Sequence, residues 1–238
     1  MALFEGLFCR TSTLELRGAV DWHSHILPGV DDGVQTMPES LAILEIYEQI
    51  GIKELWLTPH VMEDIPNSTD VLRKLFRELD EAYMGTVKLR LASENMLDNL
   101  FAERLENNDV LPIGNEGNTL LIETSYFNPP IKFHHTIDTI RSKGYHPLLA
   151  HPERYNYIDS ISDYRKLKDH GVKFQLNLMS LCGHYGSVVR DKAKRLLEDG
   201  MYDRVGSDLH GKEQLEIIRS MRLSRRITDR ITGLFGQR

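Results

Sequence analysis

Short apolar runs alternate with amphipathic stretches along most of the chain. Several apolar runs are nearly continuous, which is typical of parallel strands that are buried on both faces. They predict seven strands, at residues 19–23, 54–58, 87–93, 119–124, 146–151, 173–178 and 203–207. The amphipathic stretches between them predict helices at residues 38–50, 68–83, 97–106, 132–143, 161–170, 187–198 and 213–223. Seven strand-then-helix units predict an α/β fold, either a parallel barrel or a doubly wound sheet.

Polar residues that can bind metal follow the predicted strands at their carboxyl ends. Each of these residues alone would most often be an ordinary loop residue, but their shared position is not ordinary. The eight strand-end residues are His23, His25, His60, Glu94, Glu123, His151, Asp208 and His210. A ring of this kind is expected at the active site of a β/α barrel, whereas an open sheet gathers its site at one crevice. The placement therefore favours the barrel.

The first strand carries two histidines separated by one residue. Strand side chains alternate between the two faces, so His23 and His25 point the same way and can clamp one ion. Asp32 follows in the next loop and adds a carboxylate oxygen. Trp22, between the ligand positions, is expected to face opposite to His23, into the packing around the barrel.

The set of candidate ligands indicates both the metal and the reaction. Five histidines and four carboxylates without a thiolate suit manganese, iron or zinc. Nine ligands exceed what one ion can hold, so two or three divalent ions that share carboxylates are expected. Clustered divalent ions activate water near neutral pH and neutralise a phosphoryl group. Phosphoester hydrolysis is the reaction class that follows.

Composition limits the other possibilities. The chain has 238 residues and a net charge of −6. It suits one domain over residues 1–238, with residues 1–18 as a short N-terminal extension. The negative charge argues against nucleic acid as a partner. No apolar window is long enough for membrane insertion. Cys9 and Cys182 match no disulfide or zinc spacing, so a reduced, cytoplasmic location is the simplest interpretation.

Six short motifs give the chain a specific resemblance. They are HSH with its continuation LPGVDDG, then LTPH, ASE, LIE, AHPERY and SDLH, and they span residues 21–210. Together they resemble the PHP superfamily (polymerase and histidinol phosphatase). Within it, the chain is similar to the bacterial manganese-dependent protein-tyrosine phosphatases of capsule and exopolysaccharide synthesis. PGVDDG and HPERY are the more family-specific segments.

The resemblance implies a distorted (β/α)7 TIM-like barrel, the PHP fold, with a trinuclear site at its C-terminal rim. Mn²⁺ is the expected ion, with iron or zinc possible. The activity implied is metal-activated hydroxide attack on phosphotyrosine of a polysaccharide-biosynthesis tyrosine kinase. Position by position, the metal ligands would be His23, His25, Asp32, His60, Glu94, Glu123, His151, Asp208 and His210. The candidate catalytic residues are Arg154, Asp208 and His210.

Arg154 matches an arginine that helps to hold phosphate in these phosphatases. A guanidinium fork complements phosphate oxygens and developing negative charge, so this role is physically reasonable. The alternative is a surface ion pair with Glu153 or Asp159.

Other residues near the predicted site have supporting roles or more than one interpretation. Tyr126 and Phe127 would form an aromatic wall for the substrate ring or pack the loop they lie in. Asn177 would hydrogen-bond a ligand, and His184 would line the pocket or lie outside it. The remaining histidines are expected at the surface or in the core: His134, His135, His146 and His170.

The chain departs from the family at two loops that often carry basic residues. Glu63 and Asp64 follow His60, and only Lys212 is basic after His210, where Glu213 follows it. These carboxylates would repel an anionic substrate. A small-molecule phosphatase of the histidinol-phosphate type therefore stays open. So does a non-catalytic, metal-stabilised protein-binding module, although no ligand position is lost. The oligomeric state is not indicated.

Overall fold

The structure is a computed structural model that describes residues 11–235. All seven predicted strands are present, each within a few residues of its predicted range. They are β2 (Val20–Ser24), β3 (Glu54–Leu57), β5 (Lys88–Leu91), β7 (Thr119–Glu123), β8 (His146–Ala150), β9 (Lys173–Asn177) and β10 (Arg204–Gly206). Four further short strands are β1 (Thr11–Thr13), β4 (His60–Val61), β6 (Glu94–Met96) and β11 (Arg222–Ser224).

Seven of the α-helices in residues 11–235 follow the predicted pattern, and α8 is additional. They are α1 (Met37–Gln49), α2 (Thr69–Ala82), α3 (Phe101–Glu106), α4 (Phe133–Ser142), α5 (Ile161–Asp169), α6 (Ser187–Glu198), α7 (Lys212–Ser220) and α8 (Arg225–Phe235). Ser68 and Ser160 cap α2 and α5, because each side chain accepts a hydrogen bond from a first-turn amide. None of the helices in residues 11–235 has the length and apolar character that crossing a membrane requires.

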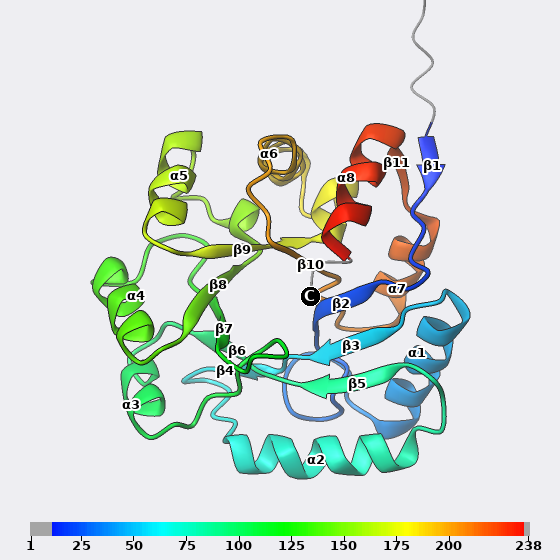
Figure 1. Cartoon of the computed structure of the whole chain (residues 1–238). Coiled ribbons are helices and arrows are strands. Elements are labelled where there is room, and N and C mark those ends of the chain that lie inside the picture. The colour runs from blue at the N-terminus through cyan, green and yellow to red at the C-terminus, as the bar shows by residue number, and fades with distance from the viewer. Residues whose placement is uncertain (1–10, 236–238) are drawn as a thin grey trace, which may run out of the picture.

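The long strands form a curled, parallel α/β arrangement with the helices around its outside (Figure 1). One sheet has the order β10-β9-β8-β7-β6-β4 and another has the order β2-β3-β5. The strand pairs β3/β4 and β5/β6 run from one sheet into the other. Backbone hydrogen bonds continue across the breaks, from Ala92 N to Leu57 O at 2.9 Å and from Glu94 N to Pro59 O at 3.0 Å.

At the other edge, β10 lies against β2. The amide of Asp208 donates to His23 O at 2.8 Å, and that of His25 donates to Leu209 O at 2.9 Å. Gly206 permits this approach, because a Cβ there would lie 2.4 Å from His23 Cβ. The contact brings the first and last strand ends together, and both carry candidate ligands.

Two hydrophobic clusters fill the molecule, and they show where Trp22 lies. The larger one includes strand residues and the inward faces of the helices. The smaller one joins Trp22 and Trp56 of one sheet to residues of β7 and β8 in the other, Leu121, Leu148 and Ala150. The two indole rings stack with centroids 5.7 Å apart. Because these strands are not neighbours, the cluster lies inside the curl, and the expectation that Trp22 joins the packing around it is wrong.

Three other differences from the predicted elements have local causes. The helix predicted at 97–106 begins at Phe101, because Glu94–Met96 extends as β6 and the Asp98 side chain accepts from the Leu100 amide. The helix predicted at 213–223 ends at Ser220, where the chain enters β11 and pairs with β1. Helix α8 was not predicted, although Ile227, Ile231 and Leu234 recur at helical spacing and are buried.

The predicted N-terminal extension is only partly within the structure. Residues 1–10, with Cys9, lie outside the described residues. Within the rest of the extension, Leu14 and Leu16 are buried in the larger hydrophobic cluster. This part of the extension therefore packs on the fold.

Candidate metal centre

The carboxyl ends of the parallel strands bring the candidate ligands together from segments far apart in the sequence. The side chains form three groups that could each hold a metal ion, and within a group the ligand atoms lie within 4.8 Å of one another. The groups are His23, His25, Glu94 and Asp208; His60, Glu94 and Glu123; and His25, Asp32, His60 and His210. Eight of the nine predicted ligands belong to at least one group.

The first group is completely buried. His23 Nε2 lies 3.0 Å from His25 Nε2 and 3.1 Å from Glu94 Oε2. Asp208 Oδ1 lies 3.4 Å from His23 Nε2 and 3.3 Å from His25 Nε2. Two imidazoles and two carboxylates converging on one point form a donor set that suits divalent manganese, iron or zinc.

The second group provides a test of whether the residues fit a metal. His60 Nδ1 lies 3.1 Å from Glu94 Oε2 and 2.9 Å from Glu123 Oε1. All three atoms are buried, yet none has a hydrogen-bond partner among the described residues. Buried polar atoms are nearly always hydrogen-bonded, so three that approach each other without such bonds require an explanation. Carboxylate oxygens that face bound cations provide one for Glu94 and Glu123, and the Nδ1 atom of His60 lies beside both of them.

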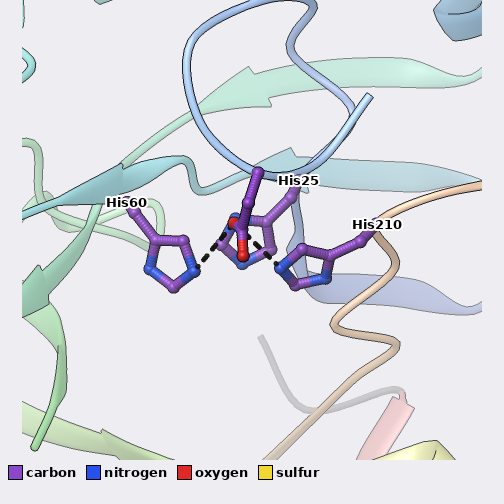
Figure 2. Close-up of side chains that lie close together, drawn as sticks. His25, His60 and His210 are labelled. Atoms are coloured by element: carbon purple, nitrogen blue, oxygen red, sulfur yellow. Dashed lines mark ion pairs between the residues drawn. The ribbon is translucent and has the colours of Figure 1, made fainter. Parts of the chain in front are cut away.

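The third group lies at the solvent edge. Asp32 Oδ1 is 3.5 Å from His60 Nε2 and 3.6 Å from His210 Nε2 (Figure 2). Figure 2 also shows the rings of His25, His60 and His210 gathered from separate segments. The side chain of Asp32 is 68% exposed, whereas those of His25 and Glu94 are 0% exposed. The candidate centre therefore runs from the interior to the surface.

His151, the ninth predicted ligand, lies next to the second group but is not one of its members. Its Nε2 atom lies 3.1 Å from Glu94 Oε1 and 4.0 Å from Glu123 Oε2. His151 and Asp208 also share an unusual backbone, with φ values of 34° and 53°. Non-glycine residues in this left-handed region cost energy and cluster at functional sites.

Two residues that the sequence did not single out orient the paired histidines. Asp31 Oδ2 lies 2.8 Å from His25 Nδ1, and Gln175 Oε1 lies 2.9 Å from His23 Nδ1. An acceptor at Nδ1 fixes the proton there and leaves Nε2 free to bind metal. Asp31 was signalled only by its position beside Asp32. Gln175 was signalled by being a polar residue in an apolar strand.

The electrostatics separate the inner part of the centre from its rim. Burial lowers the pKa of His23, but the carboxylates of Glu94 and Asp208 outweigh it and raise the pKa to about 9. Burial and the neighbouring His25 instead lower the pKa of His210 to about 4. Burial raises the pKa of Glu94, yet the surrounding histidines hold it well below its usual value. Glu94 is thus ionised and able to bind a cation.

Comparison with known proteins identifies the family. The family described as "Capsular polysaccharide synthesis, CpsB/CapC" matches residues 19–229. The chain belongs to this family. The resemblance inferred from the sequence motifs is therefore confirmed.

Relatives and a solved structure agree with this membership. The chain is 27% identical over 197 residues to the putative tyrosine-protein phosphatase CapC of Staphylococcus aureus, covering 80% of this chain and 76% of CapC. It is 26% identical over 196 residues to the tyrosine-protein phosphatase YwqE of Bacillus subtilis, covering 80% and 77%. A structure from work on YwqE and on CpsB of Streptococcus pneumoniae, described as unique metal-dependent tyrosine phosphatases, matches with a TM-score of 0.77. That match has 23% identity, covers 90% of this chain and 91% of the other, and shows a shared fold.

Arg154, in the HPERY segment of this family member, points at the centre. Its Nη1 donates to Asp208 Oδ2 at 3.0 Å. The guanidinium lies 4.5 Å from the ring centroid of Tyr126 and 4.1 Å from that of Tyr185. The alternative of an ion pair with Glu153 or Asp159 is wrong. Asp159 pairs with Lys192, and Glu153 accepts hydrogen bonds in the interior, from the Asn177 amide, the Ser180 hydroxyl and the Tyr202 hydroxyl.

The remaining candidates divide between the centre and the surface. Asn177 Nδ2 donates to Asp208 Oδ2 at 2.7 Å and to Tyr185 Oη at 3.1 Å, as expected for a residue that orients a ligand. His184 is exposed, so its neighbour Tyr185, which the sequence did not single out, is the residue that lies at the centre. Cys182 is a free, exposed cysteine.

Tyr126 is half-buried beside Arg154, whereas Phe127 is 71% exposed. Only Tyr126 therefore lies against the centre. The histidines expected outside the centre are exposed or partly exposed: His134, His135, His146 and His170. The charged residues after His60 and His210 are exposed as well: Glu63, Asp64, Lys212 and Glu213.

Proposed function

We propose that this chain is a metal-dependent phosphatase that hydrolyses phosphotyrosine in a tyrosine kinase of capsular polysaccharide synthesis. Family membership and relatives named as tyrosine-protein phosphatases support the reaction. The observation that carries the proposal is the position of Arg154. It lies at the edge of three ligand groups, where it is bonded to Asp208, a member of the innermost group.

We assign the nine predicted ligands to three ions. A neutral imidazole has one free lone pair, so His60 can serve only one of the two groups that contain it. His151 lies beside Glu94 and Glu123 and can complete that group, which leaves His60 Nε2 for Asp32 and His210. His23, His25, Glu94 and Asp208 hold the innermost ion. Mn²⁺ is the ion we expect, with iron or zinc as substitutes.

We also propose that the parallel strands form the closed barrel that the sequence predicts. If β3/β4 and β5/β6 each count as one interrupted strand, seven parallel units surround the smaller hydrophobic cluster. The hydrogen bonds between β10 and β2 support closure into a distorted (β/α)7 barrel. We take residues 1–238 as one domain that works in the cytoplasm.

The side chains of the centre would share the catalytic work with the bound ions, because they can hold the phosphoryl group in place. Bound divalent ions supply a water nucleophile near neutral pH and neutralise the phosphoryl charge. Arg154 can offer its remaining N–H donors to a phosphoryl oxygen, while Asp208 and the two tyrosine rings hold the guanidinium in place. The phenol of tyrosine has a pKa of about 10, so its departure needs less proton donation than that of an alkyl alcohol.

A small-molecule phosphatase is the second candidate. The exposed carboxylates after His60 disfavour an acidic phosphoprotein, which is the observation that keeps this alternative. A non-catalytic binding module is disfavoured, because a ligand residue is present at every predicted position and the unpartnered, buried oxygens of Glu94 and Glu123 lie in one group.

One assay distinguishes these functions. A phosphotyrosine peptide and histidinol phosphate are compared as substrates of the full chain, with added Mn²⁺ and after chelation. We expect metal-dependent turnover with the peptide preferred. Faster turnover of histidinol phosphate by orders of magnitude would reject the phosphotyrosine assignment. Absence of turnover with either substrate in a metal-loaded protein would favour the binding module.

A further inference from the structure

A groove beside the metal centre has no role in the chemistry described so far. It has a volume of about 450 Å³ and lies between α3 and the loop that joins β7 to α4. Figure 1 shows α3 and α4 next to each other, outside the strands β6 and β7. The volume is within the range of ~300–1,000 Å³ that is usual for ligand sites.

The groove begins close to the candidate centre along two strands. Met96 and Ser125 line it, and each lies two residues beyond a predicted ligand, Glu94 and Glu123 respectively. Tyr126, the next residue in the loop, contacts the Arg154 guanidinium. A phosphotyrosine held at the ions would therefore place its flanking polypeptide at this opening. Extended chain advances about 3.3–3.6 Å per residue, so a few residues suffice to reach along the groove.

One wall of the groove is apolar and exposed. Pro129, Pro130 and Ile131 line it, and Ile131 is 91% exposed. Phe127, in the same loop, is 71% exposed. Large apolar side chains grouped in this way beside a cavity indicate a surface that a partner covers.

One edge of the groove is acidic. Asn99 lines the groove and donates to Glu63 Oε2 at 3.2 Å, and the Glu63 amide donates to Asp98 Oδ2 at 2.7 Å. Asp98 is neutralised by Arg104 at 2.8 Å. Glu63 and Asp64 have no cationic partner within residues 11–235, so their charges remain available. Lys132 is exposed and follows Ile131, so it belongs to the apolar wall and not to the acidic edge.

We propose that this groove binds the polypeptide that flanks the phosphotyrosine, and that it selects substrates with lysine or arginine close to the phosphorylated residue. The proposal rests on the proposed phosphotyrosine activity and names the substrate class within it. Glu63 and Asp64 attract the basic side chain, and the wall around Ile131 covers an apolar neighbour. The loops that should repel an acidic phosphoprotein thereby become specificity elements.

The first test uses two phosphotyrosine peptides that differ only in the residues beside the phosphotyrosine, lysines in one and glutamates in the other. We expect kcat/KM with Mn²⁺ to be about 3- to 10-fold higher for the lysine peptide at low salt, as suits exposed charge pairs, and the preference to shrink at high salt. Equal values, or preference for glutamate, would overturn the groove proposal while leaving phosphotyrosine hydrolysis intact. Hydrolysis of phenyl phosphate without hydrolysis of either peptide would reject the protein substrate itself.

Reversing the charges of Glu63 and Asp64 tests whether these residues cause the preference for the lysine peptide. In the double variant Glu63→Lys with Asp64→Lys, we expect the lysine-to-glutamate ratio of kcat/KM to invert. The ratio cancels any general loss of activity or folding. Glu116→Lys is the matched control, since Glu116 is exposed and precedes β7 at the opposite end from Glu123. A ratio that responds equally to the control would mean that net charge, not the groove, sets the preference.

The apolar wall has its own test. In Ile131→Ser, we expect the ratio of kcat/KM for the lysine peptide to that for phenyl phosphate to fall about 3-fold or more, because the peptide would then cover less apolar surface in the groove. Met84→Ser removes another exposed apolar side chain, 92% exposed and away from the groove, and should keep the wild-type ratio. An unchanged ratio in Ile131→Ser would remove this wall from the binding site.

Discussion

The inner and outer parts of the candidate centre are built differently. In the inner group, His23 and His25 are completely buried, and Gln175 and Asp31 each fix one ring. In the outer group, the Asp32 side chain is 68% exposed, and His210 is oriented by a backbone carbonyl, with Nδ1 2.9 Å from Asp208 O. Preorganised ligands lose little freedom on binding, whereas exposed ones must be ordered. The inner ions should therefore bind more tightly, and the outer ion should exchange first.

The largest effect is expected at Glu94, which takes part in both inner groups. Glu94→Gln removes the charge that joins them, and kcat should fall about 10³-fold or more, since stabilisation by metal is worth several kcal/mol. Metal content measured by mass spectrometry should fall by more than one ion per chain. Glu116→Gln, the same change at an exposed site, should retain both properties. Full metal content and full activity in Glu94→Gln would contradict the inner assignment.

Arg154 links the inner group to the substrate through Asp208. Arg154→Ala should lower kcat/KM by ~1.5–3 kcal/mol, which is the range for hydrogen bonds to charged groups and corresponds to about 10- to 150-fold. Metal content should stay near that of the wild type, because arginine is not a ligand. Arg190→Ala removes an arginine that pairs with Asp191 at the surface and serves as the control. Unchanged kinetics in Arg154→Ala would remove this residue from the phosphate site.

The outer group should be separable from the inner one. Asp32→Asn should weaken the binding of one ion by at least about 10- to 100-fold, the effect usual for losing a residue that only supports a ligand, and leave the other two ions in place. Titration of the metal-free protein with Mn²⁺ would show this as the loss of the weakest step. Simultaneous loss of all three steps would mean that the two parts do not bind independently.

The sequence predicted the ligands better than it predicted their supports. Alternation along a strand was enough to pair His23 with His25, and strand ends meet wherever parallel strands lie side by side. The partners of those rings depend on tertiary distances, however. Gln175 lies 152 residues from His23, and no local pattern indicates that the two side chains meet. Tyr185 was missed for the same reason, because its contact with Arg154 is made only after folding.

The error over Trp22 has a different cause. Alternation states that Trp22 and His23 differ in direction, but it does not state which face lies inside a curled sheet. The register of β2 against β3 also shifts between Asp21 and Ser24, which disturbs simple alternation. Burial therefore followed from the sequence, while the assignment to the inner or the outer packing required the structure.

The finest test of the comparison concerns the pH dependence of metal binding. In the metal-free protein, the pKa of His23 is raised to about 9, so this ring holds a proton at neutral pH that a metal must displace. Affinity of the inner group should therefore weaken as pH falls from 9 to 7, by up to about tenfold per unit for each proton displaced. Of the outer ligands, His210 has a pKa lowered to about 4 and carries no such proton, whereas the carboxylates of Glu94 and Glu123 raise the pKa of His60. Because the pKa of His25 in the inner group is raised as well, the inner ion should displace more protons, and the outer ion should depend on pH less steeply over the same interval. Calorimetry in buffers of different ionisation enthalpy measures the protons released at each step, and Asp32→Asn identifies the outer step. Proton release confined to the weakest step would reverse the assignment of inner and outer groups.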